Sequence, residues 1–317
     1  MNSRQPTRLE AGAANAIGRT LGLLGDEWTL LFVQQAMLGV TRYGRFRAAL
    51  PVSDAVLTAR LGTLTAEGLL ERNVHRTGPL RAEYLLTSRG RSLWPVLLTI
   101  WAWERRWVTA RVPALPRMVH TACSRPFAPL LSCGACTRPV AARDIDAAWG
   151  PSGTWERSVP VASTRRRPER GRAPGRAGLF PETMAVLGNR WSSALIGAVF
   201  RGVTRFADFE RTLGSPPALL ADRLKTFVSL GVLATARAEG RPDRAEYRLT
   251  DKGRAFFPVV ATALAWAHTW FLAPDGPALV QTHRACAAAF VPDLRCDRCT
   301  DVVHRRTIQI APSIDAI

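Results

Sequence analysis

All six cysteines of the chain lie in two short segments, and each segment also carries a histidine at the same position. The first segment, HTACSRPFAPLLSCGAC, offers His120, Cys123, Cys133 and Cys136. The second, HRACAAAFVPDLRCDRC, offers His283, Cys286, Cys296 and Cys299. Both have the pattern H-x2-C, nine residues, then C-x2-C. Four such donors in two close pairs are typical of tetrahedral zinc with no open coordination position. The pattern predicts two structural zinc ions per chain, one within each segment.

Two other uses of these cysteines stay open. A C-x2-C pair can act as a redox dithiol, and the thiols could also be inert. A histidine in register with the cysteines favours a metal over a plain disulfide. The intervening residues are too few to build a core, so a metal would replace one. The other histidines, His75, His268 and His304, have no counterpart at the same offset and are interpreted as incidental.

A constant offset relates the two segments, since 283 minus 120 is 163 residues, and the offset continues upstream. LGDEW at residues 24–28 recurs as LGNRW at 187–191, and RAEY at 81–84 recurs at 244–247. The chain therefore contains one unit of about 120 residues twice, which indicates a tandem domain duplication rather than a solenoid. We call the two units copy one and copy two.

Helical periodicity dominates the first part of each unit. In copy one it predicts helices over residues 13–24 and 28–37, and a short helix over 42–50. Ser53 is a suitable N-cap for the next helix, whose buried stripe is predicted to be Val56, Leu57, Leu61 and Leu64. Two helices joined by a short turn form a helix-turn-helix.

Strand patterns follow. Residues 69–74 and 82–87 are predicted strands around a turn at 77–79, and a last helix is predicted over 89–108. A helix-turn-helix followed by a hairpin is a winged helix. The predicted fold is mainly α with small β-hairpin wings, as two winged helix-turn-helix domains in tandem, each followed by a short zinc-binding loop.

These stretches carry a family resemblance. LLGDEWTLLFVQQAMLGVTRYGRF, LTARLGTLTAEGLLER and RAEYLLTSRGRSLWPVLLTIWAW together resemble the HxlR family of winged-helix regulators, relatives of MarR. In copy two, VLGNRWSSALIGAVFRGVTRFADF and ADRLKTFVSLGVL are similar to the same family. The resemblance implies DNA-binding transcriptional regulators that act as homodimers through their terminal helices. Thiol-sensing relatives use a cysteine ahead of the first helix. This chain has none before Cys123, which argues against direct redox sensing.

The second helix of such a motif enters the major groove of DNA. In copy one it offers Ser53, Ala55, Thr58 and Arg60. In copy two it offers Ala218, Ala221, Arg223 and Lys225. Arg60 and Arg223 are the predicted base readers, because a guanidinium pairs bidentately with guanine. A structural salt bridge within each domain is the alternative role for both.

Further basic residues are predicted to contact the DNA backbone. Arg42 and Arg205 begin the third helix of each copy and suit phosphates. The wing residues Arg81, Arg241 and Arg244 suit phosphate or the minor groove. Copy two also has Asp208 and Asp222 where copy one has Arg45 and Ala59. Because carboxylates repel phosphates, copy two is expected to bind DNA differently or more weakly.

Tryptophan pairs recur on the last helix, as Trp103 with Trp107 and Trp266 with Trp270. Their spacing of four residues favours packing between the copies. An apolar pocket for a small-molecule effector between the two domains is the alternative.

Composition narrows the class of function. There are 43 Lys and Arg against 25 Asp and Glu, a net charge of +18, which attracts polyanions, although an Arg-rich coding bias explains part of it. No segment is long and apolar enough for a membrane span, so a cytoplasmic, nucleoid-associated protein without a membrane partner is predicted. The sequence has no Gly-rich phosphate loop and no nucleophile–histidine pair, which argues against an enzyme.

The predicted function is therefore sequence-specific transcriptional regulation on double-stranded DNA. The alternative is a metal- or thiol-redox-responsive regulator whose DNA affinity is controlled by the Cys/His clusters. Because one chain carries two winged helices, an intramolecular pseudo-dimer is predicted, with a homodimer of tandem chains as the competing arrangement.

The predicted domain boundaries are a winged helix at 1–112, a zinc-binding segment at 113–145, a flexible basic linker at 146–178, a second winged helix at 179–275, and a second zinc-binding segment with the C-terminal tail at 276–317. The Pro-, Gly- and Arg-rich linker spans on the order of 30 Å as a coil, which is enough for copy two to fold back on copy one.

Overall fold

The computed structural model describes residues 5–75, 81–159, 180–238 and 241–311. Each copy folds into a winged helix. In copy one the elements are α1 (Ala16–Leu24), α2 (Glu27–Met37), α3 (Tyr43–Ala49), α4 (Asp54–Ala66), β2 (Leu70–His75), β3 (Arg81–Leu86), α5 (Ser88–Arg91) and α6 (Trp94–Trp107). In copy two they are α8 (Pro181–Leu187), α9 (Arg190–Phe200), α10 (Phe206–Leu213), α11 (Pro217–Ser229), β8 (Leu233–Ala238), β9 (Arg241–Leu249), α12 (Asp251–Arg254) and α13 (Phe257–Trp270). The predicted turn at 77–79 lies outside the described residues.

Side-chain caps fix where several of these helices begin. Asn15 accepts the N–H groups of Ile17 and Gly18 at the start of α1, and Asp26 accepts that of Trp28 at the start of α2. Ser53 caps α4 as predicted, its hydroxyl accepting the N–H of Val56 at 3.4 Å. These bonds satisfy backbone donors that the first helical turn leaves unpaired.

Two details of copy one differ from the sequence prediction. The stripe of α4 consists of Leu57, Leu61 and Leu64, all buried, whereas Val56 is 37% exposed. Positions 57, 61 and 64 follow the helical repeat, and residue 56 is rotated about 100° away from them. The predicted helix over 89–108 is interrupted after α5, because Pro95 fits only the first turn of α6, where its missing N–H is not needed.

The segments after the winged helices exchange strands between the copies. In copy one they form η1 (Thr109–Ala114), β4 (Arg117–His120), β5 (Arg125–Pro126), β6 (Pro129–Cys133), η2 (Ala142–Asp144), β7 (Ile145–Trp149) and α7 (Trp155–Ser158). In copy two they form β10 (Phe271–Leu272), β11 (Leu279–His283), β12 (Pro292–Cys296), η3 (Arg305–Thr307) and β13 (Ile308–Ala311). Antiparallel pairs join β6 to β12, β7 to β11 and β4 to β13, and near the N-terminus β1 (Thr7–Arg8) pairs in parallel with β10. Both tails are therefore shared structures.

This exchange corrects the start of the predicted linker. Residues 146–149 belong to β7 and pair with β11, and residues 155–158 form α7. The remainder of the predicted linker, from residue 160 onward, lies outside the described residues.

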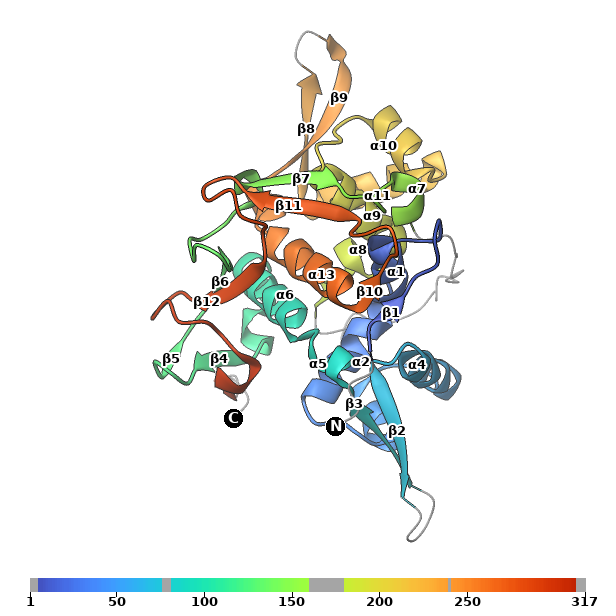
Figure 1. The fold of residues 1–317 in the computed structure, drawn as a ribbon, viewed down its shortest axis with the longest axis vertical. Helices are drawn as coiled ribbons and strands as arrows, with labels where there is room; N and C mark the ends of the chain where they lie inside the picture. The colour runs from blue at the N-terminus through green and yellow to red at the C-terminus, as the bar shows by residue number, and fades with distance from the viewer. Residues whose placement is uncertain (1–4, 76–80, 160–179, 239–240, 312–317) are drawn as a thin grey trace.

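Equivalent residues of the two copies face each other at three places. Leu131 is opposite Leu294 in the β6–β12 pair, and Asp26 forms a β-bridge with Asn189. The buried hydroxyls of Thr99 and Thr262 lie 3.3 Å apart. Contacts between a residue and its own counterpart mark a two-fold relation. Figure 1 shows the result, with the hairpins β2–β3 and β8–β9 at opposite ends of the molecule.

The last long helices, α6 and α13, pack against each other across this relation. The indole N–H of Trp103 donates to the carbonyl of Lys252, and the indole N–H groups of Trp266 and Trp270 donate to the hydroxyl of Ser92. Tryptophans of each copy thus bond to the other copy, as the packing interpretation expects. Among the helices of the described ranges, none has the length and apolarity needed to cross a membrane.

Candidate metal centres and nucleic-acid interface

The eight predicted metal ligands form two clusters, and each cluster takes two members from each copy. One contains His120, Cys123, Cys296 and Cys299. The other contains Cys133, Cys136, His283 and Cys286. The prediction of one site within each segment is therefore wrong in its grouping, although it named the right residues for the clusters.

Strand geometry explains the exchange. In each segment an extended strand, β6 or β12, separates the H-x2-C pair from the C-x2-C pair. Five extended residues span roughly 16 Å, too far for both ends to meet at one ion. The antiparallel register places Cys296 opposite Pro129 and Cys133 opposite Pro292. Each strand consequently delivers its C-x2-C pair to the H-x2-C pair of the other copy.

The separations within the clusters fit a tetrahedral ion. His120 Nδ1 lies 3.3 Å from Cys299 Sγ and 3.7 Å from Cys123 Sγ, and Cys123 Sγ lies 3.9 Å from Cys296 Sγ. In the second cluster, His283 Nδ1 lies 3.3 Å from Cys136 Sγ and 3.2 Å from Cys286 Sγ. Cys286 Sγ lies 3.9 Å from Cys133 Sγ. A zinc tetrahedron with ordinary bond lengths has edges of about 3.8 Å between sulfurs and about 3.5 Å between sulfur and nitrogen. A disulfide needs about 2 Å, and all six cysteines are free.

The backbone has an unusual conformation directly after each of the four donor pairs. Among the described residues, the non-glycine positions with positive φ are Ser124, Thr137, Ala287 and Thr300, at 54°, 64°, 56° and 63°. Each directly follows the second donor of a pair. A left-handed non-glycine residue costs about 1–3 kcal/mol and persists only where its surroundings determine it. Four repeats of one strained turn indicate that the donor pairs are built to converge.

Thiol protonation also points to a cation. The backbone N–H of Arg138 lowers the pKa of Cys136 to about 6, against the opposing effect of burial. For neighbouring Cys286 the N–H of Ala288 acts in the same direction, but burial together with Cys136 and Cys133 raises its pKa. Because adjacent thiolates repel, a cation between Cys136 and Cys286 would favour the ionised form of both.

The residues nominated on the DNA-reading helices have unequal access to solvent. Ser53, Ala55 and Thr58 on or before α4 are exposed. So are Ala218, Ala221 and Lys225 on α11. These six positions are therefore open to a partner.

Arg60 instead makes the structural contact that was its alternative. Its guanidinium lies 2.7 Å from the carboxylate of Asp26, with side-chain exposures of 24% and 17%. Asp26 is also the cap of α2 and bridges to Asn189. The pair therefore ties the reading helix of copy one to the two-fold contact.

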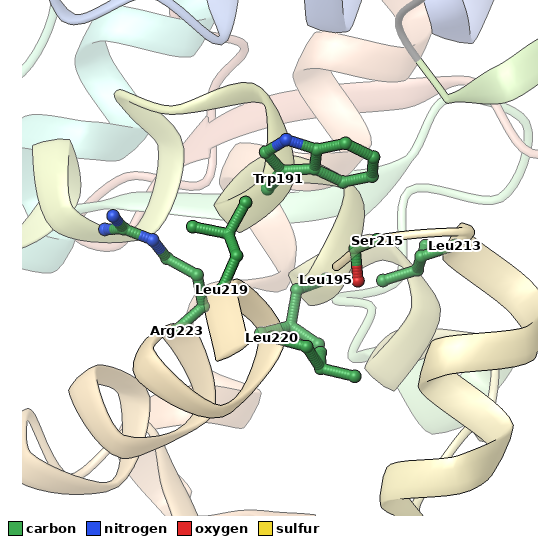
Figure 2. A pocket seen from close by; sticks show the side chains of 7 residues that line it. All are labelled: Trp191, Leu195, Leu213, Ser215, Leu219, Leu220 and Arg223. Atoms are coloured by element: carbon green, nitrogen blue, oxygen red, sulfur yellow. The ribbon is translucent and has the colours of Figure 1, made fainter. Parts of the chain in front are cut away.

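Copy two has Asn189 at the position of Asp26, and Arg223, the counterpart of Arg60, forms its ion pair with the exposed Asp222 at 3.4 Å. Figure 2 shows its stem leaving α11 beside Leu219, in the same hollow as Trp191. Its Nε is buried without a hydrogen-bond partner among the described residues. Sequence reasoning missed this difference, although its signal was visible as LGDEW against LGNRW.

The phosphate-contact candidates lie where each third helix meets its wing. Arg42 pairs with Glu83 at 3.0 Å, and Arg205 pairs with Glu246 at 3.3 Å, leaving the arginine side chains 59% and 48% exposed. Asp208 is paired with Arg211 at 2.6 Å. The side chains of the wing residues Arg81, Arg241 and Arg244 lie outside the described residues.

Comparison with known proteins identifies the two winged helices. The family model described as HxlR-like helix-turn-helix matches residues 23–112 and 186–274, which together exceed half of the chain. The chain belongs to the HxlR-like helix-turn-helix family. It is therefore a transcriptional regulator of the helix-turn-helix type and not an enzyme. Both HxlR-like matches end before the first donor of the metal cluster that follows.

The chain is also similar to individual proteins, two of which are named HTH-type transcriptional regulators. An uncharacterised HTH-type transcriptional regulator of Mycobacterium tuberculosis is 31% identical over 129 residues, covering 41% of this chain and 82% of the relative. The HTH-type regulator YvaP of Bacillus subtilis is 37% identical over 91 residues, covering 28% of this chain and 84% of the relative. A solved structure from Pseudomonas aeruginosa is 29% identical, covers 45% of this chain and 97% of its own, and gives a TM-score of 0.34.

Proposed function

We propose that this regulator binds DNA sequence-specifically as an intramolecular pseudo-dimer held closed by two structural zinc ions. The observation that carries the proposal is the composition of the clusters, each of which takes two donors from each copy. An ion bound at either cluster ties the copies together whatever else holds them.

Several contacts support the closed arrangement. The two-fold contacts, the bonded tryptophans of α6 and α13, and the three cross-copy strand pairs all lie within one chain. Because the copies are covalently linked, each meets the other at an effective concentration in the millimolar range. A second chain would have to be present above that concentration to displace one copy from the other. A homodimer of tandem chains with four reading heads is therefore the less favourable arrangement.

The donor set supports zinc in a structural role. Three thiolates and one imidazole suit zinc better than magnesium or calcium, which prefer oxygen ligands. Four protein donors fill the tetrahedron and leave no position for a water or substrate. The ions would act where the segments lack a core of their own.

Charge and exposure support DNA as the partner. The net charge of +18 attracts the phosphate backbone, and exposed positions on α4 and α11 are free to enter a groove. Because the copies differ at Asp208 and Asp222, the two half-sites should differ in sequence. Winged helices related by a two-fold bind half-sites about one helical turn or a multiple of it apart.

A thiol- or metal-responsive regulator is the second candidate. The observation that favours it is that Cys123, Cys136, Cys286 and Cys299 are free thiols and only half-buried, so that an oxidant can reach them once a metal leaves. A sensor loses and regains DNA affinity as zinc is removed and returned while the helices stay folded. A purely structural site loses DNA binding only together with its fold.

The DNA-binding proposal is tested by selecting duplexes from a random pool with the zinc-loaded full chain. The expected product is a site of two unlike half-sites, bound by one chain as measured by light scattering, with an affinity that falls steeply with salt. Equal affinity for selected and random duplexes would overturn sequence-specific binding. Two chains on one selected site would overturn the pseudo-dimer.

A further inference from the structure

An apolar cavity of about 140 Å³ lies where the two copies meet. Its walls come from α1, β7 and α7 of copy one and from α9, α13 and β11 of copy two. Aromatic rings dominate one end. Trp149 and Trp155 stand edge to face at 5.0 Å, and Phe200 and Phe257 lie 5.6 Å apart. A buried apolar cavity of about 150 Å³ is large enough to hold a benzene ring.

At three lining positions copy two carries a smaller residue than copy one. The small residues of copy two and their counterparts in copy one are Gly197 and Gln34, Ala263 and Ile100, and Ala267 and Glu104. Ile100 and Glu104 are fully buried, and the carboxylate of Glu104 accepts the backbone N–H of Thr183 at 2.7 Å. A Cβ added to Gly197 would meet nothing within 4 Å. Copy two therefore leaves space at positions where copy one carries larger side chains.

Two polar residues in the apolar lining each keep a buried polar atom without a hydrogen-bond partner among the described residues. The guanidinium of Arg201 stacks 4.4 Å from the ring of Trp149, and one of its nitrogens donates to the carbonyl of Ala147. Its Nε is buried without a hydrogen-bond partner, and none of the ion pairs found in the described ranges includes it. The hydroxyl of Thr20, a residue only 3% exposed, is also unpartnered. Copy one has Leu38 at the position of Arg201.

The lining favours a ligand that combines an anionic group with an aromatic ring. Burial disfavours the charged form of Arg201 and lowers its pKa, so an anion that pairs with it is stabilised in a partly desolvated site. A ring of one or two aromatic units fits between the tryptophans and phenylalanines. The Thr20 hydroxyl can donate to a second acceptor on the ligand.

We propose that this cavity is an effector site for a small aromatic carboxylate, whose carboxylate pairs with Arg201 and whose ring lies among Trp149, Trp155, Phe200 and Phe257. The coupling of this site to DNA, which rests on the proposed function, runs through α9. This helix lines the cavity and also supplies Trp191 and Leu195 to the hollow under α11 (Figure 2).

Calorimetry with benzoate and 1-naphthoate, and with the neutral benzamide as the matched probe, tests binding without DNA. One molecule of carboxylate per chain is expected to bind more tightly than benzamide. Arg201→Met should weaken the carboxylates at least tenfold and leave benzamide nearly unchanged. Lys225→Met, which removes one exposed charge on α11, is the control and should leave the binding of the carboxylates and of benzamide unchanged.

Filling the cavity supplies the second arm. Ala263→Ile restores the copy-one residue and should abolish binding of both carboxylates and benzamide. Ala194→Leu introduces the residue that copy one has at the equivalent position, Leu31, and should also abolish binding. It replaces Ala263→Ile in the experiment if that variant does not fold. Undiminished binding in a folded cavity-filling variant, or equal loss in Lys225→Met and Arg201→Met, would overturn the proposal. Because no DNA is present, these results stand apart from any failure of DNA binding.

Discussion

The two copies match element by element, yet they differ where they meet. Copy one has Ile100, Trp101 and Glu104, all buried, at the positions where copy two has Ala263, Leu264 and Ala267, which line a cavity. In a homodimer every substitution occurs twice and changes both halves. In a tandem chain it occurs once, so one half can keep the packing while the other loses it. The comparison shows how a two-fold frame can carry a single asymmetric site.

A second difference separates the reading helices. Copy one anchors Arg60 to Asp26 at 2.7 Å, while copy two has Asn189 at that place and leaves Arg223 with an exposed partner at 3.4 Å. The clusters, in contrast, use the same donor types in both copies, and of the three equivalent separations two agree, at 3.3 and 3.9 Å, while the third is 3.7 Å in one cluster and 3.2 Å in the other. The clusters, which both copies build together, are alike. The contacts of Arg60 and Arg223, which each copy makes by itself, differ.

Removing the metal should have the largest effect, because it releases both tails from both copies at once. Each structural ion contributes several kcal/mol, and 1 kcal/mol corresponds to roughly 2–4 °C for a chain of this size. Calorimetry after chelation should therefore show the Tm falling by about 10 °C or more. Hydrogen exchange should show equal loss of protection in β6 and β12. An unchanged Tm in protein proven free of zinc would contradict the structural role.

The next test creates space in copy one, at a position where copy two carries a small residue. Glu104→Ala gives copy one the residue type of Ala267 and leaves the buried N–H of Thr183 without its carboxylate acceptor. The free energy of unfolding should fall by about 2–4 kcal/mol. Denaturant unfolding measures it, and Ala267→Ser serves as the control on the already open side. A cost below that of the control would show that the two sides do not differ in packing.

The reading-helix arginines should differ in stability as well as in DNA preference. Arg60→Ala breaks a half-buried ion pair and should cost about 1–2 kcal/mol, whereas Arg223→Ala should cost less than 1 kcal/mol. Thermal unfolding of both variants measures the difference. In binding assays, loss of preference at one half-site only in Arg223→Ala would favour a base-reading role for copy two and a structural role for Arg60. Equal stability losses would remove the distinction.

The smallest expected effect concerns phosphate contacts. Arg42 and Arg205 are exposed cations that pair with the wing carboxylates Glu83 and Glu246, respectively. The substitutions Arg42→Ala and Arg205→Ala each remove one of these cations. Each should weaken binding to all duplexes alike and reduce the slope of log affinity against log salt by about 1. Anisotropy titrations across salt concentrations provide the measurement. A variant that loses affinity for only one sequence would reassign that arginine to base readout.

Much of this architecture could be predicted from the sequence because it is local. Periodicity located the helices and wings, Ser53 marked the start of α4, and spacing identified all eight donors. The grouping of the donors could not be predicted, since each segment carries the same pattern and either grouping satisfies it. It is decided by the β6–β12 register, which joins residues 163 positions apart at Leu131 and Leu294.

The other misses share that cause. Residues 146–149, DAAW, show no strand pattern of their own, and they form a strand by pairing with β11 of copy two. The cavity was equally hidden, because an apolar pattern records Ala263 and Ile100 alike and carries no information on the volume left between elements.

Thiol mapping of Cys296→Ser tests the shared clusters most directly. The zinc-loaded variant is alkylated under native conditions, and the modified cysteines are located by mass spectrometry. The account predicts one zinc per chain, with Cys123 and Cys299 modified and Cys133, Cys136 and Cys286 protected. Cys133→Ser is the matched control and should expose Cys136 and Cys286 instead. Modification of Cys286 and Cys299 with Cys123 protected, in the Cys296→Ser chain, would contradict the account, because it would mean that each copy holds its own ion.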